Sequence, residues 1–130
     1  MVTEVSPDGT LTLESGKRVA LVGVLMDSEG ASVLRVLVQK QDLRLQLIAH
    51  SASAGSSELA YAYLQAKYLK FPAKPNEIPD GQEVLINEFL VKLGAARVAV
   101  NQDFRYKDRF LKIQEEAKKK GEGIWSYEIP

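Results

Sequence analysis

The sequence contains no cysteine, and only one of its 130 residues is histidine. The absence of cysteine excludes disulfide bonds, zinc–thiolate sites and cysteine nucleophiles together. The single imidazole, His50, leaves little material for histidine-based acid–base chemistry. We expect His50 to face solvent at the end of a strand rather than to act as a general base.

An excess of charge of either sign is also missing, because 17 basic and 17 acidic residues balance. Proteins that mainly grip a phosphate backbone usually carry a basic excess, since counterion release supplies much of their affinity. The balance argues against a strong general nucleic-acid binder, although a local basic groove remains compatible with it.

Long apolar runs are absent as well. No stretch approaches the ~18 to 20 apolar residues that span a bilayer, and the first four residues lack the basic and apolar pattern of a signal peptide. We therefore expect a soluble protein with no membrane partner, and the sequence assigns it no compartment. Its length predicts a single domain over residues 1–130.

The pattern of apolar residues and turn signals predicts eight elements. A three-stranded meander is expected over residues 2–24, with turns at Asp8-Gly9 and Ser15-Gly16 and one buried strand at 19–24. Further strands are predicted at 42–49 and 59–64, and helices at 29–40, 87–93 and 105–120. Ser28 and Asn87 are the expected N-caps, while Gly94 and Gly121 are the expected helix stops. This order fits an α+β protein built on a five-stranded Greek-key barrel, the OB-fold, with three helices.

The C-terminal part of the chain carries a specific resemblance. Residues 85–98 read LINEFLVKLGAARV, residues 104–111 read FRYKDRFL, and residues 115–125 read EEAKKKGEGIW. These segments closely resemble the C-terminal half of the staphylococcal (micrococcal) nuclease family. The order of elements agrees with that family along roughly the whole chain, so the resemblance implies its five-stranded OB-fold barrel.

The resemblance also implies which positions should carry the chemistry. The family hydrolyses phosphodiesters with carboxylates that hold Ca²⁺, a glutamate that activates water, and two arginines that neutralise phosphoryl charge. At the matching positions this chain has apolar or small residues, namely Gly9, Ala20, Leu25 and Ser57. The resemblance therefore predicts a degenerate member that lacks the catalytic residues and binds no metal.

Weak remnants of the site lie next to these positions. Asp8 stands one residue before the first ligand position, and Arg18 shares a strand face with Ala20. Asp27 and Glu29 resemble a displaced version of the family's Asp-x-Pro-Glu segment. We expect a non-catalytic nuclease-like binding module, similar to the degenerate nuclease-like repeats of Tudor-containing proteins. The alternative is a divergent Ca²⁺-dependent phosphodiesterase that recruits these remnants to hydrolyse DNA or RNA.

A long segment between the fifth predicted strand and the second helix is the main candidate for binding. Residues 65–82 contain three prolines and a mixture of aromatic and basic side chains: Lys67, Tyr68, Lys70, Phe71 and Lys74. Long loops in compact domains are often functional. We interpret this segment as a plain insertion, with a contact with a protein or a single-stranded nucleic acid as the alternative that makes it a candidate binding segment.

Other conspicuous residues have structural interpretations. Tyr61 and Tyr63 are expected in the core or barrel wall, while Val100 and Gln102 replace two tyrosines that flank the nucleotide in the family. The run of lysines at 118–120 is expected to be a solvated last helical turn. Trp125 is expected to lock the final helix against the barrel.

Overall fold

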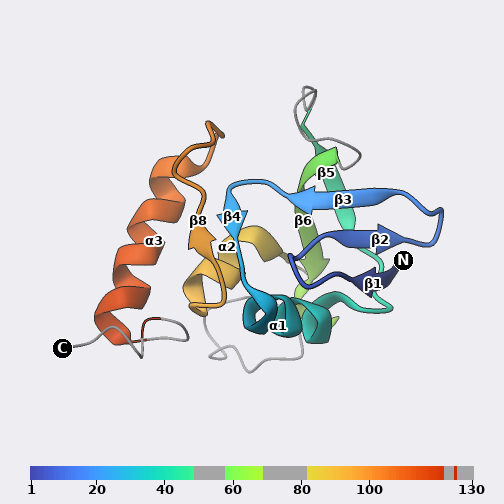
Figure 1. Cartoon of the computed structure of the whole chain (residues 1–130), viewed down its shortest axis with the longest axis horizontal. Coiled ribbons are helices and arrows are strands. Elements are labelled where there is room, and N and C mark those ends of the chain that lie inside the picture. Colours follow the sequence, from blue (N-terminus) through green and yellow to red (C-terminus); the bar gives the residue numbers. More distant parts are fainter. Residues whose placement is uncertain (49–57, 69–81, 122–124, 126–130) are drawn as a thin grey trace.

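The computed structural model describes residues 1–48, 58–68, 82–121 and 125 (Figure 1). Its strands are β1 (Val2–Val5), β2 (Leu11–Leu13), β3 (Arg18–Leu21), β4 (Val24–Leu25), β5 (Arg44–Leu47), β6 (Glu58–Gln65), β7 (Glu83–Leu85) and β8 (Arg97–Val98). Its helices are α1 (Ser28–Val38), α2 (Ile86–Lys92) and α3 (Lys107–Lys120), with a short 3₁₀ turn at Ala66–Tyr68. None of the helices in this described part is long and apolar enough to cross a bilayer.

The main sheet has the strand order expected of an OB-fold. Its path is β1-β2-β3-β6-β5. Strands β1, β2 and β3 form an antiparallel meander. Strand β6 is parallel to β3 and antiparallel to β5. Beyond β1, the amide of Val2 donates to the carbonyl of Gln41, and the amide of Lys40 donates to the carbonyl of Val2. The five strands predicted from the sequence are therefore represented by β1, β2, β3, β5 and β6, and β7 and β8 are additional.

The strand predicted across residues 19–24 is divided, which corrects that prediction. Gly23 adopts a φ of +83°, and a Cβ atom there would lie 2.6 Å from the ring of Phe104. The chain turns at this glycine, so β3 ends at Leu21 in the main sheet and β4 pairs with β8 in a second one. The apolar run could not reveal the break, because both halves are buried.

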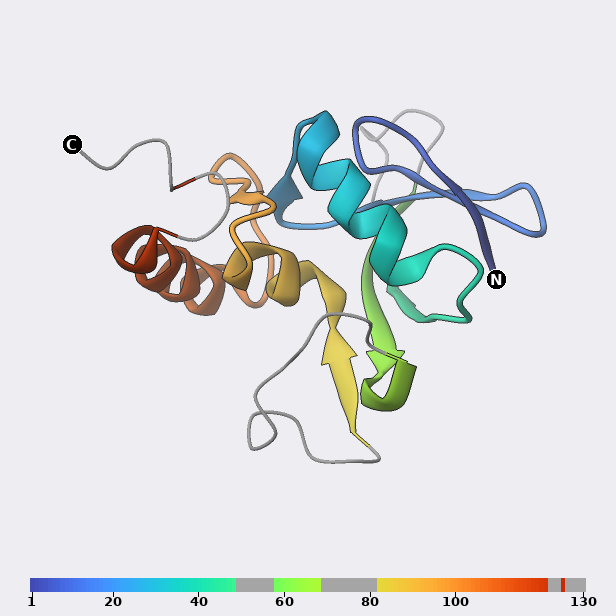
Figure 2. The same ribbon diagram turned by 90° about the horizontal axis from the view of Figure 1, so that it is seen from below.

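Helix α1 begins one residue earlier than predicted and has a different cap. The carboxylate of Asp27, rather than Ser28, accepts from the amide of Gly30 at 3.0 Å. The apolar face of the helix buries Leu34, Leu37 and Val38 against the meander strands. Figure 2 shows α1 lying across one side of the molecule, with α2 between α3 and β6.

Asn87 is not an N-cap, in contrast to the prediction, but a buried residue inside α2. Its side chain is 0% exposed and makes three hydrogen bonds to backbone groups. The amide of Ala62 donates to its Oδ1 at 2.9 Å, while its Nδ2 donates to the carbonyls of Val22 at 2.9 Å and Ala60 at 3.1 Å. This side chain joins the middle of β6 and the residue that follows β3 to the helix.

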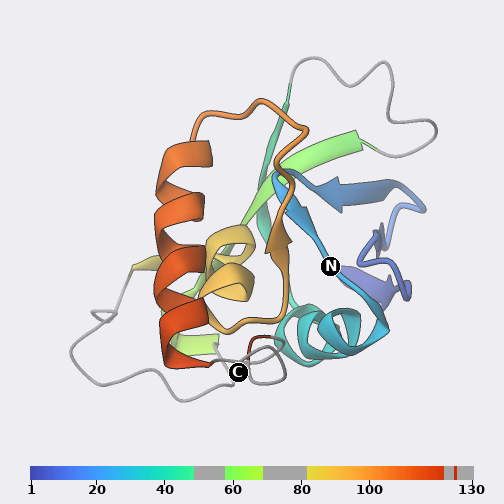
Figure 3. The same cartoon turned by 60° about the vertical axis from the view of Figure 1, so that its left-hand side comes forward.

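Helix α3 packs alongside α2, as Figure 3 shows. Phe110, Gln114 and Ala117 form its buried side, and Gly121 ends it in a left-handed conformation, as predicted. Trp125 is 3% exposed, with the guanidinium of Arg97 4.7 Å and the ammonium of Lys118 4.9 Å from its ring centre. The tryptophan thus connects β8 with the last turn of α3.

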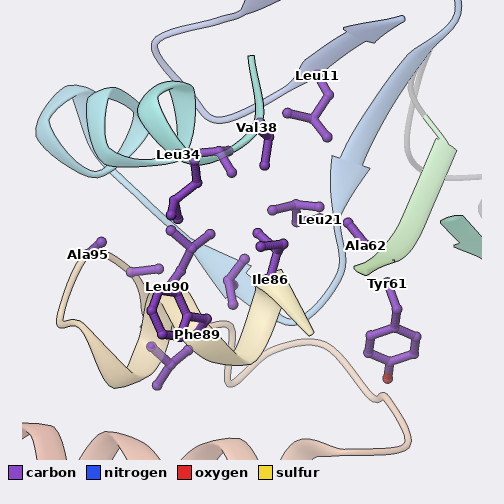
Figure 4. Close-up of a cluster of buried hydrophobic side chains, with 14 of the residues drawn as sticks. Leu11, Leu21, Leu34, Val38, Tyr61, Ala62, Ile86, Phe89, Leu90 and Ala95 are labelled. Atoms are coloured by element: carbon purple, nitrogen blue, oxygen red, sulfur yellow. The ribbon is translucent and has the colours of Figure 1, made fainter. Parts of the chain in front are cut away.

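One apolar core lies between the sheet and the helices. Figure 4 shows side chains from α1 (Leu34, Val38), the strands (Leu11, Leu21, Ala62) and α2 (Ile86, Phe89, Leu90) meeting there. Tyr61 neighbours Ala62 in β6 but points to the opposite side, toward the segment that leads into α3. Its prediction as a core or wall residue is confirmed by an exposure of 2%.

We expect Asn87→Leu to lower the free energy of unfolding by about 2 kcal/mol or more, because it leaves the buried Ala62 amide and Val22 carbonyl without partners. The Ala60 carbonyl keeps its hydrogen bond from the Val22 amide. Chemical denaturation followed by circular dichroism measures the change. Asn101→Leu, at an exposed position, is the matched control and should change stability by less than about 0.5 kcal/mol. Equal effects of the two substitutions would contradict this role of Asn87.

Candidate functional site

The turn in which the resemblance places the first calcium ligand is covered by the side chain of Met26. Gly9 has a φ of +90°, and a Cβ atom there would lie 2.6 Å from the sulfur of Met26. The neighbouring carboxylate is already used, because Oδ1 of Asp8 accepts from the amide of Thr10 at 2.9 Å. Hydrogen bonds from the Thr10 amide and hydroxyl lower the pKa of Asp8. Arg18 lowers it by a smaller amount.

The second ligand position carries an exposed apolar residue. Leu25 lies in β4, pairs with Arg97 of β8, and is 57% exposed. Asp27, two residues later, caps α1, and Glu29 is exposed in the first turn of that helix. The two acidic remnants of this segment therefore serve or flank a helix N-terminus, where negative charge is favourable without a metal.

The arginine position in β3 is occupied by a methyl group. Ala20 pairs with Leu59 of β6, and Arg18 projects from the same face of the strand, since Val19 and Leu21 between and beyond them are buried. Arg18 is exposed and is the only remnant cation on this strand. Ser57, the second arginine position, lies outside the described residues, as does His50.

The residues present do not fit a calcium ion. Ca²⁺ takes six to eight oxygen ligands at about 2.3 to 2.6 Å. Within residues 1–48, 58–68, 82–121 and 125, no three acidic or histidine side chains lie close enough to share an ion. The remnants Asp8, Asp27 and Glu29 are therefore not brought together into one site.

A hollow of about 510 Å³ lies between β5, β6 and the segment before α3. It mixes apolar walls with side-chain amides, one carboxylate and one guanidinium, and its lining includes Leu47, Leu59, Tyr61, Gln46, Asn101, Gln102, Asp103 and Arg105. Oε1 of Gln102 accepts from the amide of Gly23 at 2.9 Å, which anchors this segment to the break between β3 and β4.

Arg105 is the principal cation of this hollow. Its Nη2 donates to Oε1 of Gln46 at 3.2 Å, and its guanidinium lies 4.6 Å from the ring centre of Tyr106 and 6.0 Å from that of Tyr61. Burial raises the pKa of Tyr61, and the backbone amides of residues 105 and 106 oppose that rise. The hollow can therefore offer side-chain amide and guanidinium contacts beside apolar surface to a ligand.

The predicted binding segment is only partly described. Lys67 and Tyr68 lie in the 3₁₀ turn, both exposed, with the Lys67 ammonium 5.1 Å from the ring centre of Tyr68. Lys70, Phe71 and Lys74 lie outside the described residues. Sequence reasoning missed the hollow altogether, because its lining comes from three segments that are distant in sequence and individually unremarkable.

A family model described as staphylococcal nuclease homologue matches residues 55–127, more than half of the chain. The chain belongs to the staphylococcal nuclease homologue family. The match covers β6, α2 and α3 and so includes the segments that suggested the resemblance. No curated protein matches the chain. Gly9, Ala20 and Leu25 all lie before the matched region of the family.

We expect Gly9→Ala to destabilise the protein by about 1 to 3 kcal/mol, because it places a Cβ in a left-handed backbone conformation and against Met26. Gly16→Ala is a matched control: Gly16 has a φ of +88° but nothing within 4 Å of an added Cβ. Thermal and urea denaturation of both variants separate the backbone cost from the contact with Met26. A smaller loss for Gly9→Ala than for Gly16→Ala would contradict the close packing of this turn.

Stability should also depend on the ionisation of Asp8. Because the pKa of Asp8 is lower in the folded protein, its carboxylate contributes stability above its ordinary pKa of about 4, and that contribution is lost as pH falls through the folded value. Asp8→Asn should flatten this part of the acid unfolding profile. An unchanged profile, measured by urea denaturation at a series of pH values, would show that the turn does not favour the charged form.

Proposed function

We propose that this protein is a non-catalytic binding domain that retains the nuclease frame without its metal site. The observation that carries the proposal is the packing of Met26 over Gly9, because it removes the space in which a first calcium ligand would stand. The exposed Leu25 at the second ligand position supports the same conclusion, since an apolar side chain cannot coordinate a hard cation.

The magnitude of these losses favours binding over catalysis. Removing one group that stabilises a transition state typically costs about 10²- to 10³-fold in rate. Ala20 removes such a group, and loss of the metal removes the charge around which the remaining groups work. Together, the loss of the arginine at position 20 and the loss of the metal would leave phosphodiester hydrolysis no faster than the uncatalysed reaction.

The remnant acids do not restore the enzyme. Asp8 and Asp27 each accept a hydrogen bond from a nearby backbone amide, and these local contacts hold the β1–β2 turn and the start of α1. Turning either carboxylate toward an ion would break a contact that the fold uses. Arg18 and Glu29 are both exposed. Among the described residues, Glu29 belongs to no cluster of acidic side chains that could hold an ion.

The hollow beside Arg105 is the better candidate for function. Most concave ligand sites are largely apolar with a few well-placed polar groups, and this one has Leu47, Leu59 and Tyr61 beside side-chain amides. It offers one guanidinium and not a row of basic groups, so it suits peptide or other amide-bearing groups better than a phosphate backbone. Binding to single-stranded nucleic acid would instead show a steep loss of affinity with salt.

A nuclease assay tests the proposal. With fluorescent single-stranded DNA and millimolar calcium, the purified protein should give no more cleavage than Glu29→Gln or a buffer blank. The paired variant distinguishes intrinsic activity from a contaminating nuclease, since a contaminant would act equally in both preparations. Calcium-dependent cleavage that disappears in Glu29→Gln would overturn the proposal and restore the phosphodiesterase.

A further inference from the structure

The outer edge of β5 is unpaired in the described part of the chain. Strand β5 ends the sheet order, with β6 on one side and no described strand on the other (Figure 1). The backbone of Val2 forms hydrogen bonds with the backbone of Lys40 and Gln41. These two residues precede β5, which begins at Arg44. The seam at which an OB-fold barrel would close therefore has open backbone groups along β5.

The register shows which backbone groups face this seam. The amide of Ile48 donates to the carbonyl of Leu59, so this pair exchanges hydrogen bonds, and the pairs two and four residues along do the same. Arg44 and Gln46 therefore bond to β6, while the N–H and C=O groups of Leu45 and Leu47 point to the open edge.

Hydrogen bonds on the far side of β6 support this register independently. Ala60 and Ala62 stand opposite Leu47 and Leu45. The carbonyl of Ala60 accepts from Val22 and the amide of Ala62 donates to Asn87, so both groups point away from β5. The pairs Leu45–Ala62 and Leu47–Ala60 are therefore the pairs of the β5–β6 ladder that do not exchange hydrogen bonds. This agrees with the hydrogen bond between Ile48 and Leu59.

The edge also exposes apolar surface that another strand would cover. Leu45 and Leu47 face the same side of the sheet as the buried Ala60 and Ala62, yet Leu47 is 43% exposed and Leu45 is only partly buried. Natural proteins usually blunt open edges with proline, a bulge or an inward charge. Strand β5, which reads Arg-Leu-Gln-Leu, has none of these along its two open positions.

The other face of β5 carries one neutralised guanidinium, that of Arg44, and one guanidinium, that of Arg105, whose hydrogen-bond partner is uncharged. Arg44 forms a bidentate pair with Glu83, whereas Arg105 donates to the uncharged Gln46. An added strand would place alternate side chains beside Gln46 and Arg44, within the distance at which cross-strand pairs interact. Acidic side chains fit there, and apolar side chains fit on the opposite face beside Leu45 and Leu47.

We propose that the open edge of β5 binds an extended peptide whose side chains alternate between apolar and acidic. Backbone hydrogen bonds to Leu45 and Leu47 would hold the strand, and the alternation would set its register, as in other cases of strand addition. A second copy of this chain fits less well, because pairing β5 with β5 would bring Arg44 and Arg105 of both copies onto a shared edge.

This inference rests on the proposed function in treating the chain as a binding domain and names its partner as a peptide. Its failure is distinguishable from failure of the proposed function. The edge of β5 is separate from the emptied ligand positions at Gly9 and Leu25, so the nuclease assay and the peptide experiment can have independent results.

Amide hydrogen exchange measured by NMR tests the inference residue by residue. The probe is an acetylated and amidated hexapeptide of alternating valine and glutamate. At a peptide concentration about ten times the dissociation constant, exchange at Leu45 and Leu47 should slow about tenfold, while Arg44 and Gln46, already in the ladder, should change little. Absence of protection at Leu45 and Leu47, or protection without this alternation, would overturn the inference.

Four controls sharpen the experiment. Leu45→Pro removes an edge donor without removing a bond to β6, and should abolish binding, whereas Leu45→Ala keeps the donor and should bind. A hexapeptide of alternating valine and lysine, or the Arg105→Glu variant with the original peptide, should bind at least about tenfold more weakly. Equal binding of the two peptides would refute the acidic preference, and concentration-dependent protection without peptide would identify a second copy as the occupant instead.

Discussion

The hydrogen bonds of Asn87 are the interaction on which the C-terminal half of this structure depends. Strand β3 pairs with β6 as far as Ala60, and β7 pairs with the same side of β6 from Tyr63 onward. The Ala60 carbonyl and Ala62 amide fall in the gap between these partners, and the Asn87 side chain bonds to both. An apolar residue there would leave buried backbone groups unpaired. The same contact fixes α2, which carries Ile86, Phe89 and Leu90 into the core.

The region in which the resemblance placed the calcium ligands is organised by local contacts. Asp8 and Asp27, the acids nearest to the expected ligand positions, each bond to a backbone amide two or three residues ahead. Met26 fills the space above Gly9. These interactions stabilise a turn and a helix start without any need for an ion. The frame of this chain is held by the hydrogen bonds of Asn87 and by the apolar core.

The sequence predicted the elements that have strong periodicity and clear end signals. The stripe of Phe110 and Ala117, together with Gly121, defined α3, and the alternation of leucines defined β5. It missed the division at Gly23, because a left-handed glycine between two buried strands has no distinctive pattern, and it misread Asn87, because an asparagine near a helix start is more often a cap. The candidate site was partly predictable: the replaced ligand positions are visible in the chain, whereas the hollow at Arg105 depends on tertiary contacts between distant segments.

The chemistry of the hollow and of the β5 edge points to the same mode of recognition. Both use Gln46 and Arg105, and both offer hydrogen-bonding groups beside apolar surface. Phosphate binding needs concentrated positive charge, but the carboxylates Glu83 and Glu88 neutralise Arg44 and Arg109 through direct ion pairs. Peptide backbones need only spaced donors and acceptors, which a strand edge provides in register.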